Sequence, residues 1–131
     1  MIVDSSALLA ILRSEAEATR MTDCIFASDS RFMASANLLE AAMVAEARGG
    51  VNGAAELDTL VSNLGLLIAP FTEEHVGLAR QAFRRFGKGQ GHPARLNFGD
   101  CIAYALARAR GEPLLFKGND FSRTDIEVAA Y

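Results

Sequence analysis

The sequence predicts an α/β protein in which helices cover both faces of a mostly parallel central sheet, a three-layer α/β/α arrangement. Short β-branched or apolar runs alternate along the chain with longer segments of helical composition, which is the pattern of repeated strand–helix–strand units. Connections of this kind join parallel strands through right-handed crossovers. The 131 residues contain no linker, repeat or low-complexity segment, so we expect a single domain, 1–131.

Composition excludes several other classes of protein. Hydrophobic residues make up 50% of the chain and charged residues 22%, a balance typical of soluble globular proteins. The longest apolar run, LGLLIAPF, is much shorter than the ~20 residues of a membrane span and fits a buried strand. Asp4 interrupts the N-terminus and no basic region precedes it, so we expect no signal peptide, a cytoplasmic protein, and reduced thiols at Cys24 and Cys101.

In the first half of the chain, two strands alternate with helices. The β-branched pair Ile2-Val3 opens a strand, and Ser5 or Ser6 is expected to cap the helix that follows. Gly49-Gly50 ends the strongly helical stretch ANLLEAAMVAEAR. The expected strands are 2–4 and 31–35, and the expected helices are 6–13, 15–28, 36–48 and 53–64.

The second half contains clearer boundary signals. A strand at 66–69 stops at Pro70, and Thr72 caps a helix over 73–86 that has glutamates in its first turn. GKGQGHP is a loop, and Asn97 caps a helix that Gly111 ends. PLLF at 113–116 is a strand, and IEVA at 126–129 is expected to be the last one.

Four carboxylates stand where such a sheet would gather them. Asp4 ends the first strand, Glu40 lies early in the helix after the second, Asp100 begins a later helix, and Asp120 follows the strand PLLF. Ligands of parallel α/β sheets bind outside the carboxyl ends of the strands. The sequence therefore predicts that these four side chains approach one another.

Taken singly, each carboxylate has a structural explanation. Asp4 can cap the first helix, Glu40 can face solvent, and Asp100 can complete a capping box with Asn97; Asp120 can be an ordinary turn residue. Taken together, they would repel one another. Like charges ~4 Å apart repel by about 4 kcal/mol at an effective dielectric constant near 20, and only protonation or a cation relieves that repulsion. Oxygen-only ligands suit Mg²⁺ or Mn²⁺, whose chemistry is the activation of water and the stabilisation of phosphate charge.

A basic stretch precedes the third of these carboxylates. RQAFRRFGKGQGHPAR contains five Arg or Lys residues and no acidic residue, although the net charge of the chain is −3. The stretch either steers a polyanion towards the carboxylates or is simply a solvated helix end that runs into a flexible loop. The candidate residues for contact with such a polyanion are Arg84, Arg85, Lys88, Arg95 and, beside Asp120, Lys117; the last is otherwise a solvated turn lysine.

The segments MIVDSSALLAIL, ANLLEAAMV and LNFGDCIAYALARARGEPLLFKGNDF, in this order, resemble a PIN domain and more narrowly the VapC toxins of bacterial toxin–antitoxin modules. The resemblance runs from Met1 to about Ile126. It implies that Asp4, Glu40 and Asp100 are the first three catalytic, metal-binding acids and Asp120 the fourth. Asp125 is a rival for the fourth place. Ser6 matches the hydroxyl that orients the metal site, although DSS stands here where many relatives have DTS.

The resemblance also implies an activity and partners. PIN nucleases hydrolyse RNA with Mg²⁺ or Mn²⁺ by water attack in line, which leaves a 5′-phosphate and a 3′-hydroxyl. VapC-like toxins form homodimers and are silenced by a small VapB-like antitoxin that places a basic side chain in the acidic pocket. The RNA target, its cleavage sequence, the number of metal ions and the identity of the antitoxin stay open.

Two other functions compete with this one. A receiver-type signalling module also gathers acids at strand ends and has a lysine after its last strand, as Lys117 is here. It needs a phospho-accepting aspartate after the middle strand, where this chain reads IAPFTEEH, and paired acids after the first strand, where Asp4 stands alone. A PIN fold that binds without catalysis is the other rival, and the presence of all four acids argues against it.

Overall fold

Four short parallel strands lie side by side at the centre of the structure, a computed structural model that describes residues 1–131. Their order across the sheet is β3-β2-β1-β4, and every neighbouring pair is parallel. The strands are β1 (Ile2–Val3), β2 (Phe32–Ala34), β3 (Leu67–Ala69) and β4 (Leu114–Leu115). Because β1 is a central strand, Asp4 leaves the sheet near its middle.

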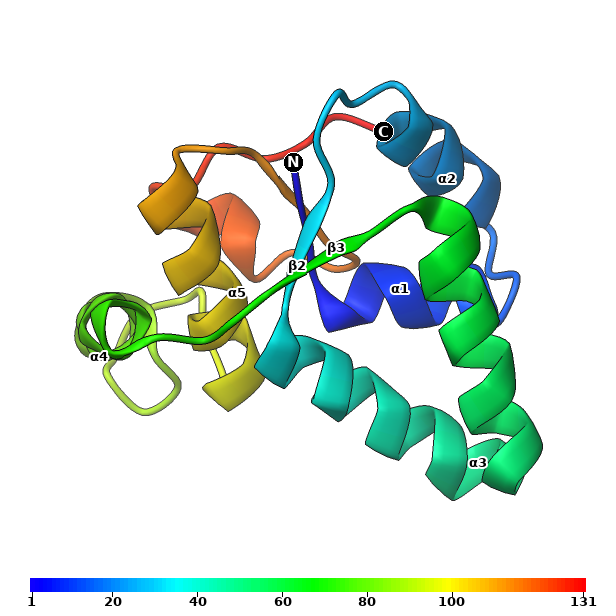
Figure 1. The fold of residues 1–131 in the computed structure, drawn as a ribbon. Helices are drawn as coiled ribbons and strands as arrows, with labels where there is room; N and C mark the ends of the chain where they lie inside the picture. Colours follow the sequence, from blue (N-terminus) through cyan, green and yellow to red (C-terminus); the bar gives the residue numbers. More distant parts are fainter.

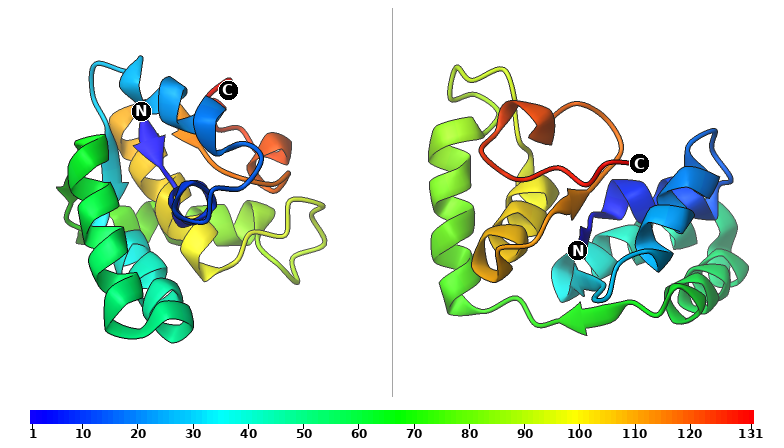
Figure 2. Two further views of the ribbon diagram at one scale, coloured as in Figure 1. Left: turned by 90° about the vertical axis from the view of Figure 1, so that its right-hand side faces the viewer. Right: turned by 90° about the horizontal axis from the view of Figure 1, so that it is seen from above.

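Helices flank the sheet in two groups (Figures 1 and 2). One group contains α1 (Ser5–Leu12), α2 (Ala18–Phe26) and α3 (Ser35–Leu64), and the other contains α4 (Glu73–Phe86) and α5 (Phe98–Arg110). The view from above in Figure 2 shows the two groups on opposite sides of the strands. A short 3₁₀ helix, η1 (Phe121–Arg123), follows β4. The expected three-layer fold is confirmed, and the sheet is entirely parallel.

The two faces of the sheet belong to two hydrophobic cores. Val3 and Leu115 pack in the core formed with α1–α3, whereas Ile2 and Leu114 pack in the core formed with α4 and α5. All four side chains are 0% exposed. Successive side chains of a strand point to opposite faces, so a strand covered on both sides needs apolar residues at every position. This requirement explains the apolar pairs Ile2-Val3 and Leu114-Leu115.

Capping explains where two helices begin. Thr72 and His75 form a reciprocal capping box at the start of α4: Thr72 N–H donates to His75 Nδ1 at 3.2 Å, and His75 N–H donates to Thr72 Oγ1 at 3.4 Å. Asn97 caps α5, as expected. The two helices predicted at 36–48 and 53–64 are the two arms of α3, which bends at Gly50 (φ 59°, ψ −148°). A positive φ of this kind favours glycine, so Gly50 permits the bend.

Two predictions about strands are wrong. The run LGLLIAPF does not form a buried strand, because β3 is the edge strand and leaves Leu67 56% and Ile68 39% exposed. The segment 126–129 is not a strand either: it meets β4 through one isolated bridge, Leu114 to Val128. An edge position and a single bridge depend on tertiary neighbours, which a local apolar pattern does not reveal. No helix has the length and apolar character needed to cross a membrane.

Candidate active site

Asp4 is buried at the carboxyl end of β1. Its backbone N–H donates to the Leu115 carbonyl at 2.9 Å, which continues the sheet pairing, and its side chain caps α1 in place of the expected Ser5 or Ser6. Carboxylate Oδ2 accepts hydrogen bonds from Ser6 N–H at 2.9 Å and from Ser6 Oγ at 2.5 Å. The other oxygen, Oδ1, is buried and has no hydrogen-bond partner. One oxygen is therefore fixed, and the other is free for a ligand.

Burial makes Asp4 an unusual carboxylate. It is 2% exposed, and this burial raises its pKa above the ordinary value, since a charge is less stable away from water. The two Ser6 hydrogen bonds oppose the rise, and the nearby charge of Glu40 adds to it. A cation beside Asp4 would stabilise the ionised form.

Glu40 reaches the same place from the second turn of α3. Ser5 Oγ donates to its Oε2 at 2.8 Å, and the Asn37 amide donates to Oε2 at 3.3 Å and to the Gly99 carbonyl at 3.0 Å. The carboxylate lies directly against the backbone of Gly99, where a Cβ atom would stand 2.5 Å from Oε2. Only glycine fits at position 99 with Glu40 in this place. Glu40 is thus held between α1 and α5.

Asp100 presents its carboxylate from the first turn of α5. Its Oδ2 accepts Asn97 N–H at 2.8 Å, and its own N–H donates to Asn97 Oδ1 at 2.9 Å, so the expected capping box is present. Burial raises the pKa of Asp100 to about 6; the Asn97 hydrogen bond opposes the rise, and the charges of Asp4, Asp120 and Glu40 add to it. Asp100 therefore caps α5 and, at the same time, is influenced by the negative charges of the other three acids.

Asp120 lies on the loop between β4 and η1. It is exposed, and no hydrogen bond or ion pair holds its side chain. It lines a cavity of about 260 Å³ with the other three acids, and the cavity's lining residues are Asp4, Ser5, Ser6, Leu9, Glu40, Val44, Asn97, Asp100, Lys117, Asp120 and Phe121. The structure therefore brings together all four predicted carboxylates and Ser6.

Asp125, the rival for the fourth place, faces elsewhere. Tyr104 Oη donates to its Oδ1 at 2.7 Å, and Arg85 donates to its Oδ2 at 2.9 Å. Burial raises the pKa of Asp125, but these two hydrogen bonds and the charges of Arg85 and Arg108 together outweigh that effect, and the net pKa is lowered. Both of its oxygens are engaged outside the acidic cavity.

Of the five basic residues predicted to contact RNA, one lines the acidic cavity. This residue is Lys117, whose N–H donates to Ser6 Oγ at 3.0 Å and whose ammonium pairs with Glu15 and, at 3.5 Å, with Glu17. Arg85 is paired with Asp125. Arg84 lines an apolar groove of about 610 Å³ between α4 and α5, and Lys88 and Arg95 are exposed on the adjoining loop.

Three site residues were not predicted from the sequence. Ser5 and Asn37 hold Glu40, and Gly99 makes room for it. The signals were present but weak: Ser5 adjoins Asp4, and Asn37 lies three residues before Glu40, one turn away on the same helix face. Which hydroxyl serves which carboxylate depends on the packing of α1 against α3, which only the structure shows.

The donor set suits a hard divalent cation. All four acids offer oxygen, no histidine or cysteine except the neighbouring Cys101 adjoins them in the sequence, and a buried Asp4 oxygen has no partner. As the side chains stand, no group of three or more His, Cys, Asp or Glu residues is close enough together to hold an ion. Mutual repulsion between like charges opposes a closer approach. A cation bound among these acids would therefore draw them together.

The comparisons with family models, with individual relatives and with solved structures agree with one another. The family model described as PIN domain matches residues 1–127. Ribonuclease VapC28 of Mycobacterium tuberculosis is 45% identical over 129 residues, 98% of this chain and 97% of the relative. The crystal structure of the Mycobacterium tuberculosis toxin VapC20, which cleaves the sarcin–ricin loop, superimposes with a TM-score of 0.73 at 16% identity over 95% of both chains. Rickettsia felis VapBC2, bound to a DNA fragment from its promoter, gives 0.76 at 14% identity over 97% of this chain and 94% of that one.

Proposed function

Since this chain belongs to the PIN-domain family, we propose that it is a metal-dependent endoribonuclease of the VapC type, the toxin of a toxin–antitoxin module. Relatives named as VapC ribonucleases are 39–45% identical over nearly the whole chain. The observation that carries the proposal is the convergence of Asp4, Glu40, Asp100 and Asp120 on one cavity from four separate segments. A receiver-type module is no longer a candidate, because the family is a different one.

Asp4, Glu40, Asp100 and Asp120 would hold Mg²⁺ or Mn²⁺. When bound, such a cation lowers the pKa of water and offsets the charge that develops on a phosphodiester. The chain's own contribution is the fixed orientation of the acids. Ser6 holds Asp4, Ser5 and Asn37 hold Glu40, and Asn97 holds Asp100 through Oδ2. Side chains fixed in this way need little reorganisation when ligands arrive.

The reaction proposed is hydrolysis, with water as the nucleophile. A ribonuclease that uses the RNA 2′-hydroxyl instead needs a general base such as histidine. The two histidines of this chain serve the backbone: His75 completes the cap of α4, and His92 accepts from Ala94 N–H at 3.1 Å. Neither lines the acidic cavity. We therefore expect products with 5′-phosphate and 3′-hydroxyl ends.

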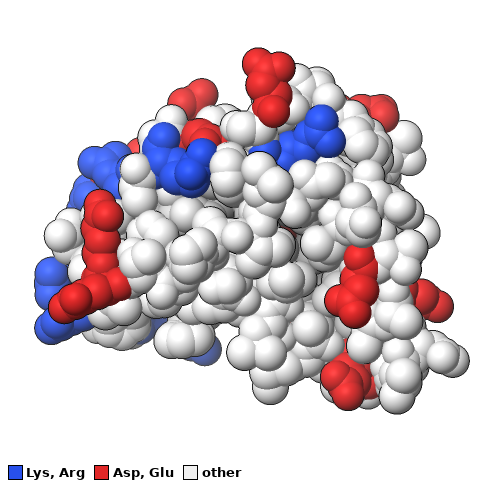
Figure 3. All heavy atoms as spheres, viewed as in Figure 1, with Lys and Arg blue, Asp and Glu red and all other residues white.

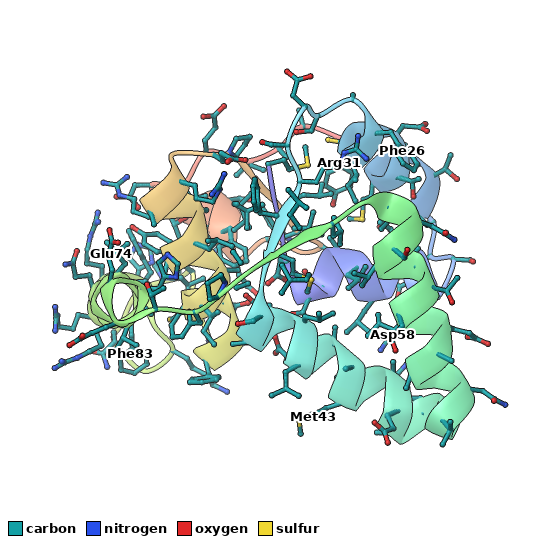
Figure 4. The ribbon with its side chains drawn as sticks, viewed as in Figure 1. Phe26, Arg31, Met43, Asp58, Glu74 and Phe83 are labelled. Carbon is teal, nitrogen blue, oxygen red and sulfur yellow. The ribbon has the colours of Figure 1, made fainter.

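A second copy of the chain is the proposed partner on one apolar face. We assign to this face the exposed apolar residues of the first arm of α3, of β3 and of the groove between α4 and α5, which are Leu39, Met43, Leu67, Ile68, Val76, Phe83 and Phe98. Figure 3 shows few charged side chains over β3 and the first arm of α3, and Figure 4 shows Met43 and Phe83 directed outward. Large exposed apolar patches mark interaction sites, and the edge strand β3 contributes Leu67 and Ile68 to this face. A homodimer would cover the same face on both copies.

A VapB-like antitoxin and RNA are the remaining proposed partners. The Rickettsia felis structure is a VapBC2 assembly on promoter DNA, and this chain shares its fold. The acidic cavity would accept a basic side chain of an antitoxin in the absence of RNA. Arg84, Arg85, Lys88, Arg95 and Lys117 stay the candidates for RNA contact.

Controlled expression in a bacterial host tests this proposal. Induction of the chain alone should arrest growth, and co-expression of its antitoxin should restore it. The Asp4→Asn variant should be harmless at equal expression level, because it removes the buried charge of the site. Unimpaired growth with the unmodified chain would contradict the assignment as a toxin.

A further inference from the structure

The segment that follows Asp120 is attached to α4 and α5 through Asp125. Tyr104 from α5 donates to Asp125 Oδ1 at 2.7 Å, and Arg85 from α4 donates to Oδ2 at 2.9 Å. Arg108 lies 4.0 Å from the same carboxylate. Tyr104 is 3% exposed, so its hydroxyl offers a fixed anchor. Asp125 thus ties the C-terminal segment to both helices of one layer.

The segment between Asp120 and Asp125 is short and internally braced. Phe121 is 2% exposed and packs edge-on against Phe116, with their ring centroids 4.9 Å apart. Thr124 closes the turn: its hydroxyl donates to the Phe121 carbonyl at 2.8 Å, and it accepts Ile126 N–H at 3.3 Å. A braced segment transmits a displacement from one end to the other. A shift of Asp125 would therefore move Asp120.

Asp120 differs from the other three acids in how it is held. Asp4, Glu40 and Asp100 each accept hydrogen bonds that fix one carboxylate oxygen. Asp120 accepts none, so its place at the cavity depends entirely on the backbone of its loop. Any residue that fixes this loop also fixes Asp120.

We propose that Asp125 is a positioning residue that holds Asp120 at the acidic cavity through the Tyr104 and Arg85 contacts, and that Asp125 does not bind the cation itself. The proposal rests on the proposed function, because it concerns the fourth acid of that site. It separates two roles that the sequence leaves ambiguous. Asp120 faces the cation, and Asp125 places Asp120.

The test is a double-mutant cycle on Mn²⁺ affinity, measured by calorimetric titration of the metal-free chain. We expect Asp125→Asn to weaken Mn²⁺ binding about tenfold, the lower end of the losses seen when supporting contacts of a metal site are removed. Tyr104→Phe removes only one of the two contacts and should weaken binding less. In an Asp120→Asn background, neither change should have a further effect. Glu127→Gln, an exposed acid two residues away, controls for the loss of one negative charge.

Activity and dynamics provide independent readouts. With RNA, Tyr104→Phe should lower kcat and leave KM unchanged, because Tyr104 is only 3% exposed and offers almost no surface to a substrate. Amide hydrogen exchange at Thr124 and Ile126, whose N–H groups donate hydrogen bonds within this turn, should become faster in Tyr104→Phe without any metal present.

Three results would overturn the proposal. A loss in Asp125→Asn as large as that in Asp120→Asn, and additive with it, would make Asp125 a ligand. Unchanged Mn²⁺ affinity with a lowered Tm would make it merely structural. Unchanged amide exchange at Thr124 and Ile126 would show that the loop does not depend on the contacts of Asp125. Failure of the unmodified chain to bind Mn²⁺ would instead count against the proposed function, and the exchange experiment would still decide the positioning role.

Discussion

The Glu40 carboxylate lies against Gly99, so closely that a Cβ atom at position 99 would stand 2.5 Å from Glu40 Oε2. This contact joins α3 to α5 at the acidic cavity. A substitution at position 99 therefore tests whether RNA cleavage depends on the location of the Glu40 carboxylate. A glycine in the first turn of a helix is otherwise an unfavourable residue by up to about 1 kcal/mol relative to alanine.

Gly99→Ala should reduce RNA cleavage at least tenfold, because the added methyl group displaces Glu40. The better helix propensity of alanine and the overpacking cost of about 1–3 kcal/mol act in opposite directions on stability, so the fold should persist. Gly77→Ala in α4 is the matched control, since its Cβ would meet no atom within 4 Å. It should stabilise slightly and leave cleavage unchanged. Full activity of Gly99→Ala would mean that Glu40 is not needed where it lies.

Asp100→Asn should abolish cleavage and make the metal-free protein more stable at pH 7. The folded-state pKa of Asp100 is raised to about 6, above the unfolded value of about 3.9. The contribution of Asp100 to the free energy of unfolding is therefore fully present below about pH 4, and this contribution is lost as pH rises through 6. Asparagine keeps the hydrogen bond to Asn97 and removes this loss, a gain of about 1–2 kcal/mol after allowance for solvent screening.

Thermal unfolding in EDTA from pH 4 to pH 8 measures this effect. The curves of Asp100→Asn and the unmodified chain should coincide near pH 4 and separate by several degrees above pH 6. A difference that does not change with pH, or a less stable variant at pH 7, would contradict the origin assigned to the pKa shift.

Divalent cations should stabilise the folded chain. Binding to the native state alone adds about 2.7 kcal/mol at a concentration 100 times the Kd. Addition of Mn²⁺ or Mg²⁺ should therefore raise the Tm, and Asp4→Asn should remove most of the rise, because Asp4 supplies the buried free oxygen. An equal rise in Asp4→Asn would place the cation elsewhere.

Leu67→Lys should convert the proposed homodimer to a monomer. Leu67 is 56% exposed on the edge strand β3, and a charge there would be buried without a partner in a dimer. Val51→Glu on the second arm of α3 is the control, since Val51 is 81% exposed and lies outside the proposed face. Sedimentation equilibrium of the two variants decides the matter. A monomeric unmodified chain at micromolar concentration, or a dimeric Leu67→Lys variant, would exclude this interface.

The sequence predicts those features of the fold whose interacting residues are neighbours in the sequence. The cap at Thr72, the cap at Asn97 and the break at Gly50 are all readable because capping and left-handed backbone involve residues within a few positions of one another. The exposure of Leu67 and the failure of 126–129 to form a strand were not predictable in this way. They depend on which strands lie beside them.

The candidate site shows the same division. Parallel strands place Asp4 and Asp120 at one edge of the sheet, so their approach follows from topology. The partners of Glu40 do not follow from it, because Ser5 and Gly99 belong to two other helices. The pairing of Asp125 with Tyr104 likewise connects residues 21 positions apart and gives no local signal.

The most direct test of the central claim is the chemistry of the RNA ends. Purified protein is incubated with mixed cellular RNA in Mg²⁺ and, separately, in EDTA, and the fragments are analysed at both termini. The account predicts cleavage only with Mg²⁺, fragments with 5′-phosphate and 3′-hydroxyl ends, and no cleavage by Asp100→Asn. Cleavage that persists in EDTA, or fragments that end in 2′,3′-cyclic phosphate, would contradict it.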